Sequence, residues 1–78
     1  MEVEDVARKY ATKNAFEHKG SAQAGAVIGK VKALFPQVNL AEVAPLINKI
    51  VQEVNALDSV KLKEEYEFYD KEGWELKQ

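Results

Sequence analysis

The chain has 78 residues, no cysteine, a single histidine and a net charge of −2. This length allows one small domain with a modest core, over residues 1–78, so a deep catalytic cleft is not expected. The composition also argues against a disulfide framework, a thiolate metal site and a strongly basic nucleic-acid-binding domain. No apolar run approaches the roughly 20 residues of a membrane span, and the acidic start "MEVEDVARKY" is unlike a signal peptide. We therefore expect a soluble, cytoplasmic protein.

Charge is distributed unevenly along the chain. Six basic and four acidic residues lie before Pro36, whereas five basic and nine acidic residues lie after it. Only the N-terminal half could therefore present a mildly electropositive face to a partner.

The first predicted helix covers residues 3–17. Gly20 follows it as a natural C′ residue in the left-handed conformation, and His18 would interact with the negative helix end. Tyr10 and Asn14 could be either a buried polar pair or an exposed contact. Residues at helical spacing predict one buried face (Val3, Val6, Ala7, Tyr10, Ala11, Asn14, Ala15) and a separate charged row (Asp5, Lys9, Lys13, Glu17).

A second helix is predicted from a cap at Ser21 or Gln23 to about Leu34, before Pro36 stops it. Its predicted buried stripe leaves Lys30 and Lys32 at the flanks, where their ammonium groups reach solvent. The stripe consists of Val27, Ile28, Val31, Leu34 and Phe35.

The third helix has the clearest pattern. Asn39 and Glu42 form an N-x-x-E capping arrangement, and Pro45 about one turn later predicts a kink or a later start. Apolar residues then repeat at i, i+3, i+4 and i+7: Val43, Leu46, Ile47, Ile50, Val51 and Val54.

A fourth helix is predicted over residues 60–71, capped by Asp58 or Ser59 and closed by Gly73. Trp74 and Leu76 could then fold back onto the bundle. The predicted apolar side has Val60, Leu62, Tyr66 and either Tyr69 or Phe68. No segment alternates as a strand would, so the expected fold is all-α, a bundle of three to four helices.

No motif predicts catalysis or a metal site. "AGAVIGKV" fails as a phosphate-binding loop, because Ala24 and Val31 replace the required Gly and Ser or Thr. The acidic run of the fourth helix has the pattern of a solvated face, and it lacks an accompanying base or nucleophile. The aromatic residues near the C-terminus suggest core and cover more than a base-stacking platform, since only Lys71 interleaves with them.

Two interior glycines of the second helix, Gly25 and Gly29, need an explanation, because each costs about 1 kcal/mol relative to alanine. With Ala22 and Ala26 they form a strip of small residues at i,i+4 spacing. One interpretation is that the first helix packs into this strip inside the domain. The other is that the strip and the helix N-terminus present backbone amides, bordered by lysines, to an RNA phosphate.

Three stretches, "ARKYATKNAFEHKG", "AQAGAVIGKV" and "VAPLINKIVQEVNAL", resemble the N-terminal helical appendage of archaeal-type glutamyl-tRNA synthetases over residues 3–60. The glycine motif is also similar to the tail domain of the amidotransferases that convert Glu-tRNA to Gln-tRNA. The family commonly opens the glycine helix with Asn-Pro, whereas this chain has Gln23-Ala24. The class I catalytic signatures are absent, so the resemblance implies an appendage without the catalytic domain. It implies no cofactor for this chain, with ATP belonging to the catalytic domain of the parent.

The resemblance implies a role in tRNA handling for an accessory domain of a glutamate-tRNA ligase, with no activity of its own. A protein-interaction module, which docks the synthetase onto another synthetase or an amidotransferase, is the alternative; the acidic C-terminal half favours it. Residues implied by the resemblance in tRNA binding are Lys19, Gln23, Gly25, Gly29 and Lys30. Further phosphate contacts are expected from Lys9, Lys13, Lys32 and Arg8.

Overall fold

Four helices form the part of the chain that the computed structural model describes, residues 3–18 and 20–74. They are α1 (Val3–Glu17), α2 (Ala24–Leu34), α3 (Leu40–Asn55) and α4 (Ser59–Glu72). No strand occurs in these residues. The predicted all-α bundle is therefore confirmed. None of the described helices is long and apolar enough to cross a membrane.

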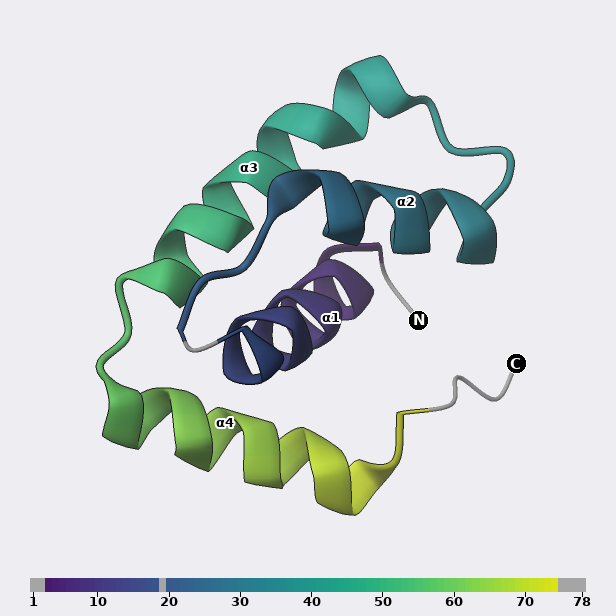
Figure 1. Cartoon of the computed structure of the whole chain (residues 1–78). Coiled ribbons are helices and arrows are strands. Elements are labelled where there is room, and N and C mark those ends of the chain that lie inside the picture. The colour runs from purple at the N-terminus through teal and green to yellow at the C-terminus, as the bar shows by residue number, and fades with distance from the viewer. Residues whose placement is uncertain (1–2, 19, 75–78) are drawn as a thin grey trace.

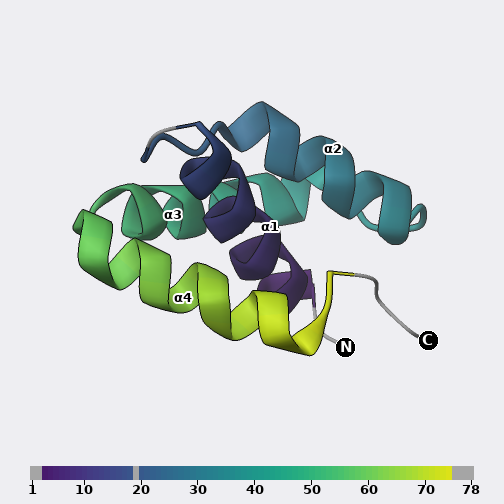
Figure 2. The same cartoon turned by 60° about the horizontal axis from the view of Figure 1, so that its bottom comes forward.

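Helix α1 is the centre of the bundle. It contacts all three other helices, with α2 and α3 on one side and α4 on the other (Figures 1 and 2). Ala7, Ala11 and Ala15 are fully buried, and their small side chains let the neighbouring helices approach closely. Thr12 is also fully buried, where its hydroxyl donates a hydrogen bond of 2.9 Å to the Arg8 carbonyl. The helix spans the residues that the sequence predicts.

The loop between α1 and α2 is fixed by two asparagines. Gly20 adopts φ 90°, as predicted. Asn14 Oδ1 accepts the backbone N–H of Gln23 at 2.7 Å, and Asn55 Oδ1 accepts that of Ala22 at 2.7 Å. Asn55 also donates to the Ala22 carbonyl at 3.1 Å. These bonds set the position at which α2 begins.

Helix α2 buries its predicted stripe against α1 and α3. Gln23, rather than Ser21, is the N-cap, and its side chain makes no capping hydrogen bond. Val27 and Val31 are almost completely buried, and each such side chain contributes about 1.5–3 kcal/mol relative to an exposed position. The predicted stripe is confirmed, with Ile28, Leu34 and Phe35 partly buried at its edge.

Helix α3 begins at Leu40, directly after its cap. The Asn39 side chain accepts the Ala41 N–H at 2.9 Å. Pro45 lies inside the helix, which is continuous from Leu40, so the later start that Pro45 suggested is wrong. Because the Asn39 cap already satisfies an orphan amide of the first turn, the helix can form before Pro45 is reached.

Helix α4 packs chiefly on α1. Asp58 is its N-cap and accepts the Lys61 N–H at 2.9 Å, while Gly73 ends it with φ 92°. Leu62 is its buried residue. Val60 is 65% exposed, so its predicted place on the apolar side is wrong, because α4 touches the bundle along a narrower line than its sequence suggested. The prediction for Leu76 lies outside the described residues.

Candidate functional site

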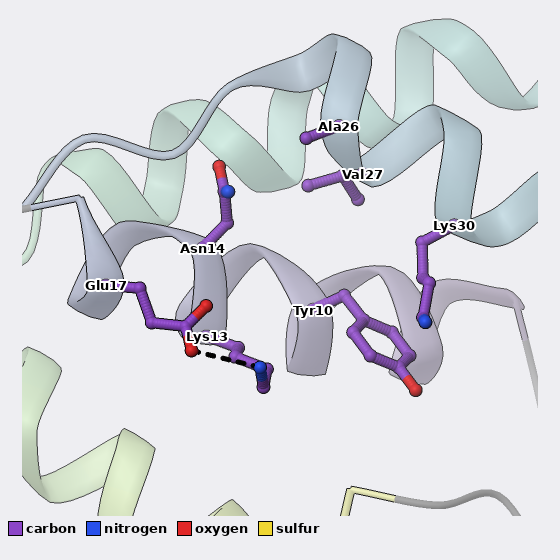
Figure 3. A pocket seen from close by; sticks show the side chains of 7 residues that line it. All are labelled: Tyr10, Lys13, Asn14, Glu17, Ala26, Val27 and Lys30. Atoms are coloured by element: carbon purple, nitrogen blue, oxygen red, sulfur yellow. Dashed lines mark hydrogen bonds and ion pairs between the residues drawn. The ribbon is translucent and has the colours of Figure 1, made fainter.

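An open groove lies between α1 and α2 (Figure 3). It encloses a volume of about 160 Å³. Helix α1 and helix α2 each supply one wall, so the groove exists only in the folded domain. Its lining comprises Tyr10, Lys13, Asn14 and Glu17 from α1 and Ala26, Val27 and Lys30 from α2.

Two lysines border this groove from opposite walls. Lys30 Nζ lies 5.1 Å from the centre of the Tyr10 ring, at cation–π distance. The Tyr10 hydroxyl donates a hydrogen bond of 2.9 Å to the Trp74 carbonyl, which fixes the ring beneath Lys30. Lys13 pairs with Glu17 at 3.0 Å on the opposite wall (Figure 3). The groove thus presents two ammonium groups with an aromatic surface between the helices.

The glycine strip of α2 is exposed. Gly25 and Gly29 are both solvent-accessible, and a Cβ atom built on either would meet no neighbouring atom within 4 Å. The interpretation that α1 packs against these two glycines is therefore wrong, although Ala22 of the same strip is buried in the core. Packing between the two helices instead involves Val27 and Val31 of α2 and the alanines of α1. Gly25 and Gly29 do not line the groove, but each is followed in α2 by a residue that does, Ala26 and Lys30.

The first turn of α2 leaves backbone amides without a side-chain cap, next to the same groove. Gln23 is exposed at the N-cap, and its side chain accepts no amide. The free N–H groups and the positive end of the helix dipole can therefore bind a negatively charged group. Of the predicted residues, the structure thus places Lys13 and Lys30 in the groove and leaves Gln23, Gly25 and Gly29 exposed outside its lining.

The remaining predicted residues lie elsewhere. Lys32 is exposed, but it does not line the groove and donates to the Pro36 carbonyl at 2.8 Å. Lys9 is only 7% exposed, and its ammonium group donates to the Gly73 carbonyl. Lys9 belongs to the predicted charged row of α1 but is buried, because the turn after α4 lies over it. Lys19 lies outside the described residues.

Tyr10 and Asn14 are neither a buried polar pair nor free surface residues. Each is half-buried and hydrogen-bonded to a different segment, Tyr10 to Trp74 and Asn14 to Gln23. No pattern in the sequence indicates these partners, because the contacts join residues that are not neighbours at helical spacing. The one signal that the sequence offers for these contacts is Asn14, a single asparagine near the end of the predicted first helix.

The side of α1 facing α4 has an aromatic cluster that sequence reasoning underestimated. Phe16 stacks on Tyr66 with ring centres 4.1 Å apart, and Trp74 lies 5.2 Å from Tyr66. Lys9 and Lys13 lie 5.8 Å and 5.7 Å from the Trp74 ring centre. Lys71 is the one basic residue between these aromatic residues in the sequence, but α1 supplies two further lysines from a distant part of the chain.

Arg8 is bound to acidic residues and does not face the groove. Its guanidinium pairs with Glu65 through two hydrogen bonds, of 2.9 Å and 3.2 Å, and lies 3.5 Å from Glu53. The hydrogen bond with Glu65 raises the pKa of Arg8 above its ordinary value, against a smaller opposing effect of burial. Glu65 thus departs from the solvated acidic face that the sequence predicted for α4.

Comparisons with known proteins identify relatives. The chain is 47% identical to a glutamate-tRNA ligase of Pyrococcus furiosus over 79 residues, which include 94% of this chain and 14% of that protein. It is 47% identical to the glutamate-tRNA ligase of Pyrococcus abyssi over 91% of this chain and 14% of that protein. For the ligase of Thermococcus onnurineus the values are 46%, 90% and 13%.

No family model and no solved structure matches the chain. The chain spans about one seventh of the length of these Pyrococcus relatives. The resemblance stated from its motifs is therefore confirmed: the homologues of this chain are archaeal glutamate-tRNA ligases, of which it matches a small segment.

Proposed function

We propose that this chain is an accessory tRNA-binding domain of a glutamate-tRNA ligase. It would contribute contacts to the RNA phosphate backbone, while the catalytic chemistry would be performed elsewhere in the enzyme. The groove between α1 and α2 and the adjoining glycine strip would form the binding surface. The names of the relatives support tRNA as the partner, because each is a ligase that acts with tRNA.

The main observation behind this proposal is the exposure of Gly25 and Gly29 beside the lysines of the groove. Gly29 lies in the interior of α2, where a glycine destabilises the helix, and Gly25 lies in its first turn; no intramolecular packing compensates for either. Their backbone is accessible to a partner that must approach closely, as a sugar-phosphate chain does. Lys30 and Lys13 would then supply charge to phosphates lying along the helix.

Glu17 limits the affinity of this surface. Its carboxylate pairs with Lys13 at 3.0 Å, so a phosphate that binds Lys13 must compete with it. The groove therefore suits a weak, additive contribution to tRNA affinity more than an independent high-affinity site. A substitution of Glu17 by glutamine should strengthen binding, because it removes the competing negative charge.

The test is a titration of fluorescently labelled tRNA for glutamate with the purified chain, followed by anisotropy at several salt concentrations. The logarithm of the wild-type binding constant should fall linearly with the logarithm of the salt concentration. Lys30→Ala should make this slope shallower by about 0.7–0.9 for each phosphate that the wild-type lysine neutralises. Lys49→Ala is the matched control, because Lys49 is an exposed lysine of α3 outside the groove.

Two results would contradict the proposal. One is the absence of binding even at low salt, where electrostatic attraction is least screened. The other is an equal effect of Lys30→Ala and Lys49→Ala, which would indicate a diffuse attraction without a defined surface. A random RNA hairpin tests whether tRNA is preferred over other folded RNA.

A second candidate function is docking of another protein onto α4. Phe68 and Val60 are 60% and 65% exposed, and Glu64 and Glu67 lie on the same helix. Exposed apolar side chains among acidic residues suit a partner with a basic, partly apolar surface, such as another synthetase or an amidotransferase. Under this function Phe68→Ser would abolish capture of the purified partner, while Lys30→Ala would leave it unchanged.

A further inference from the structure

All three cations of α1 in the described part of the chain contact the segment formed by α4 and Gly73–Trp74. Arg8 forms two hydrogen bonds with Glu65 of α4. Lys9 donates to the Gly73 carbonyl and lies 5.8 Å from the centre of the Trp74 ring. Lys13 lies 5.7 Å from the same ring centre. The Glu65 carboxylate, the Gly73 carbonyl oxygen and the face of the Trp74 ring each carry a full or partial negative charge. This segment therefore contacts the basic side of α1 in the way that an anionic ligand would.

The groups that contact the Lys9 ammonium are weak partners for a buried charge. Its side chain is 7% exposed, yet within the described residues no carboxylate lies within 4.0 Å of its ammonium group. Burial of an ammonium group is costly unless a strong partner compensates. A carbonyl oxygen and an aromatic ring compensate only in part, whereas a phosphate would offer a full negative charge and shorter hydrogen bonds.

Helix α4 is also the helix with the fewest buried residues. Leu62 is its only buried side chain among the described residues, and its principal helix contact is with α1. In Figures 1 and 2 it lies on the opposite side of α1 from α2. Besides Leu62, the attachment consists of the Phe16–Tyr66 stack, the half-buried Tyr69 and a few polar contacts, so α4 buries less than the core helices and opens at lower free energy. Opening of α4 would leave α1, α2 and α3 in contact with one another.

We propose that α4 and the Gly73–Trp74 turn mask a second RNA-binding surface on α1, formed by Arg8, Lys9 and Lys13, and that the RNA backbone competes with α4 for it. This inference rests on the proposed function, because it concerns the same partner. Lys13 borders both the open groove and the masked surface, so the two surfaces are continuous along α1. RNA bound in the groove could extend onto Lys9 and Arg8 when α4 is displaced.

The first experiment weakens the mask. The double variant Glu65→Gln, Trp74→Ala removes the ion pair between Glu65 and Arg8 and the ring beside Lys9 and Lys13, while the Glu53 contact of Arg8 and the Gly73 contact of Lys9 remain. We expect tighter tRNA binding and a salt slope steeper by about 1.4–1.8, because Arg8 and Lys9 would each add about 0.7–0.9 for one phosphate contact, while Lys13 already borders the open groove. Glu67→Gln is the matched control, because it also removes one negative charge from α4, from a pair with Lys63 that does not involve α1.

The second experiment observes the mask in the wild-type chain. Trp74 is the only tryptophan, so intrinsic fluorescence excited at long wavelength reports on this turn alone. Displacement of α4 should make Trp74 more accessible to acrylamide as tRNA is added, with the same midpoint as the anisotropy change. Far-UV circular dichroism of each variant verifies that the helices remain folded.

The outcomes separate this inference from the proposed function. Tighter binding with a steeper slope in the double variant, or gained acrylamide access in the wild type, supports masking. Masking is overturned if the wild type binds tRNA, the salt slope of the double variant changes no more than that of Glu67→Gln, and Trp74 gains no acrylamide access. The proposed function then remains intact. Absence of binding by both wild type and double variant at low salt overturns both.

Discussion

The lysines on the two sides of α1 differ in their exposure to solvent. Towards α2, Lys13 and Lys30 line an open groove beside two exposed glycines. Towards α4, Lys9 is buried under the turn that follows the helix. Lys9 and Lys13 are one turn apart on the same helix, so their local sequence does not explain the difference. Lys13 lies beside the same Trp74 ring yet stays half-buried at the groove, so the availability of a lysine depends on how completely the segment after α4 covers it.

The same difference applies to small residues. Ala11 of α1 is fully buried, whereas Gly29 of α2 faces empty space. Small residues on α1 are therefore a packing requirement, and those on α2 are a feature of the surface. Substitutions at Ala11 and Gly29 should differ most in their effect on the free energy of unfolding. Substitutions at Lys9, Gly25 and Tyr69 test the same comparison through smaller effects.

Ala11→Leu and Gly29→Leu should have opposite consequences for folding. Leucine at position 11 would overpack the contact between α1 and its neighbours, at a cost of about 1–3 kcal/mol in a domain with little stability to spare. Leucine at position 29 should leave the free energy of unfolding unchanged or slightly higher, since it meets no neighbour within 4 Å. Urea denaturation measures both. Equal losses in the two variants would contradict the assignment of Gly29 to the surface.

Lys9→Met should raise the free energy of unfolding, by about 1 kcal/mol. The substitution keeps an unbranched chain of similar size in the site while removing the cost of burying an ammonium group. The Gly73 carbonyl that loses its donor is half-buried, so water can replace the bond. Lys30→Met, at an exposed position, is the control and should change stability little.

Thermal unfolding of both variants provides the measurement. A loss of stability in Lys9→Met would show that the Lys9–Gly73 contact is a structural clamp. In that case α4 would be attached more firmly than its small buried area suggests.

Gly29→Ala should stabilise the domain by about 0.5–1 kcal/mol, because alanine is the better residue in a helix interior and open space surrounds the position; Gly25→Ala, in the first turn, should stabilise it by less. For a domain of this size that corresponds to a rise in Tm of about 2–8 °C. If the strip contacts RNA, the same variants should bind tRNA more weakly. Stabilisation without any change in binding would remove the strip from the proposed surface while leaving Lys30 in it.

The helices were predictable because their signals are local. Asn39 and Asp58 cap α3 and α4 through their own following amides, and Gly73 ends α4 with positive φ. Such interactions join residues a few positions apart, and periodicity gives the buried stripe of each helix. The bounds of α1 and the stripe of α2 were predicted for this reason.

The site was only partly predictable, because it depends on contacts between distant residues. The cost of Gly25 and Gly29 indicated a special role, and the neighbouring Lys30 indicated its charge. Their exposure agrees with the predicted stripe, because burial of Val27 and Val31 leaves Gly25 and Gly29 on the other face of α2. The burial of Lys9 depends on Gly73, which is 64 positions away.

The smallest expected effect is a loss of stability in alkali that originates at the α1–α4 contact. Burial, followed by the charge of Glu65, raises the pKa of Tyr69 above its ordinary value of 10.0. Well below pH 10.0 the folded and unfolded states both keep the phenol proton, so Tyr69 adds no pH dependence. As pH rises further, the unfolded chain loses its proton first, and the free energy of unfolding falls until the folded pKa is passed. Tyr69→Phe should remove this part of the alkaline decline, which urea denaturation between about pH 8 and 11 would detect as a widening difference between variant and wild type. Parallel curves over that range would mean that the phenol titrates equally in both states, and α4 would then lie more loosely on α1 than the half-buried Tyr69 ring implies.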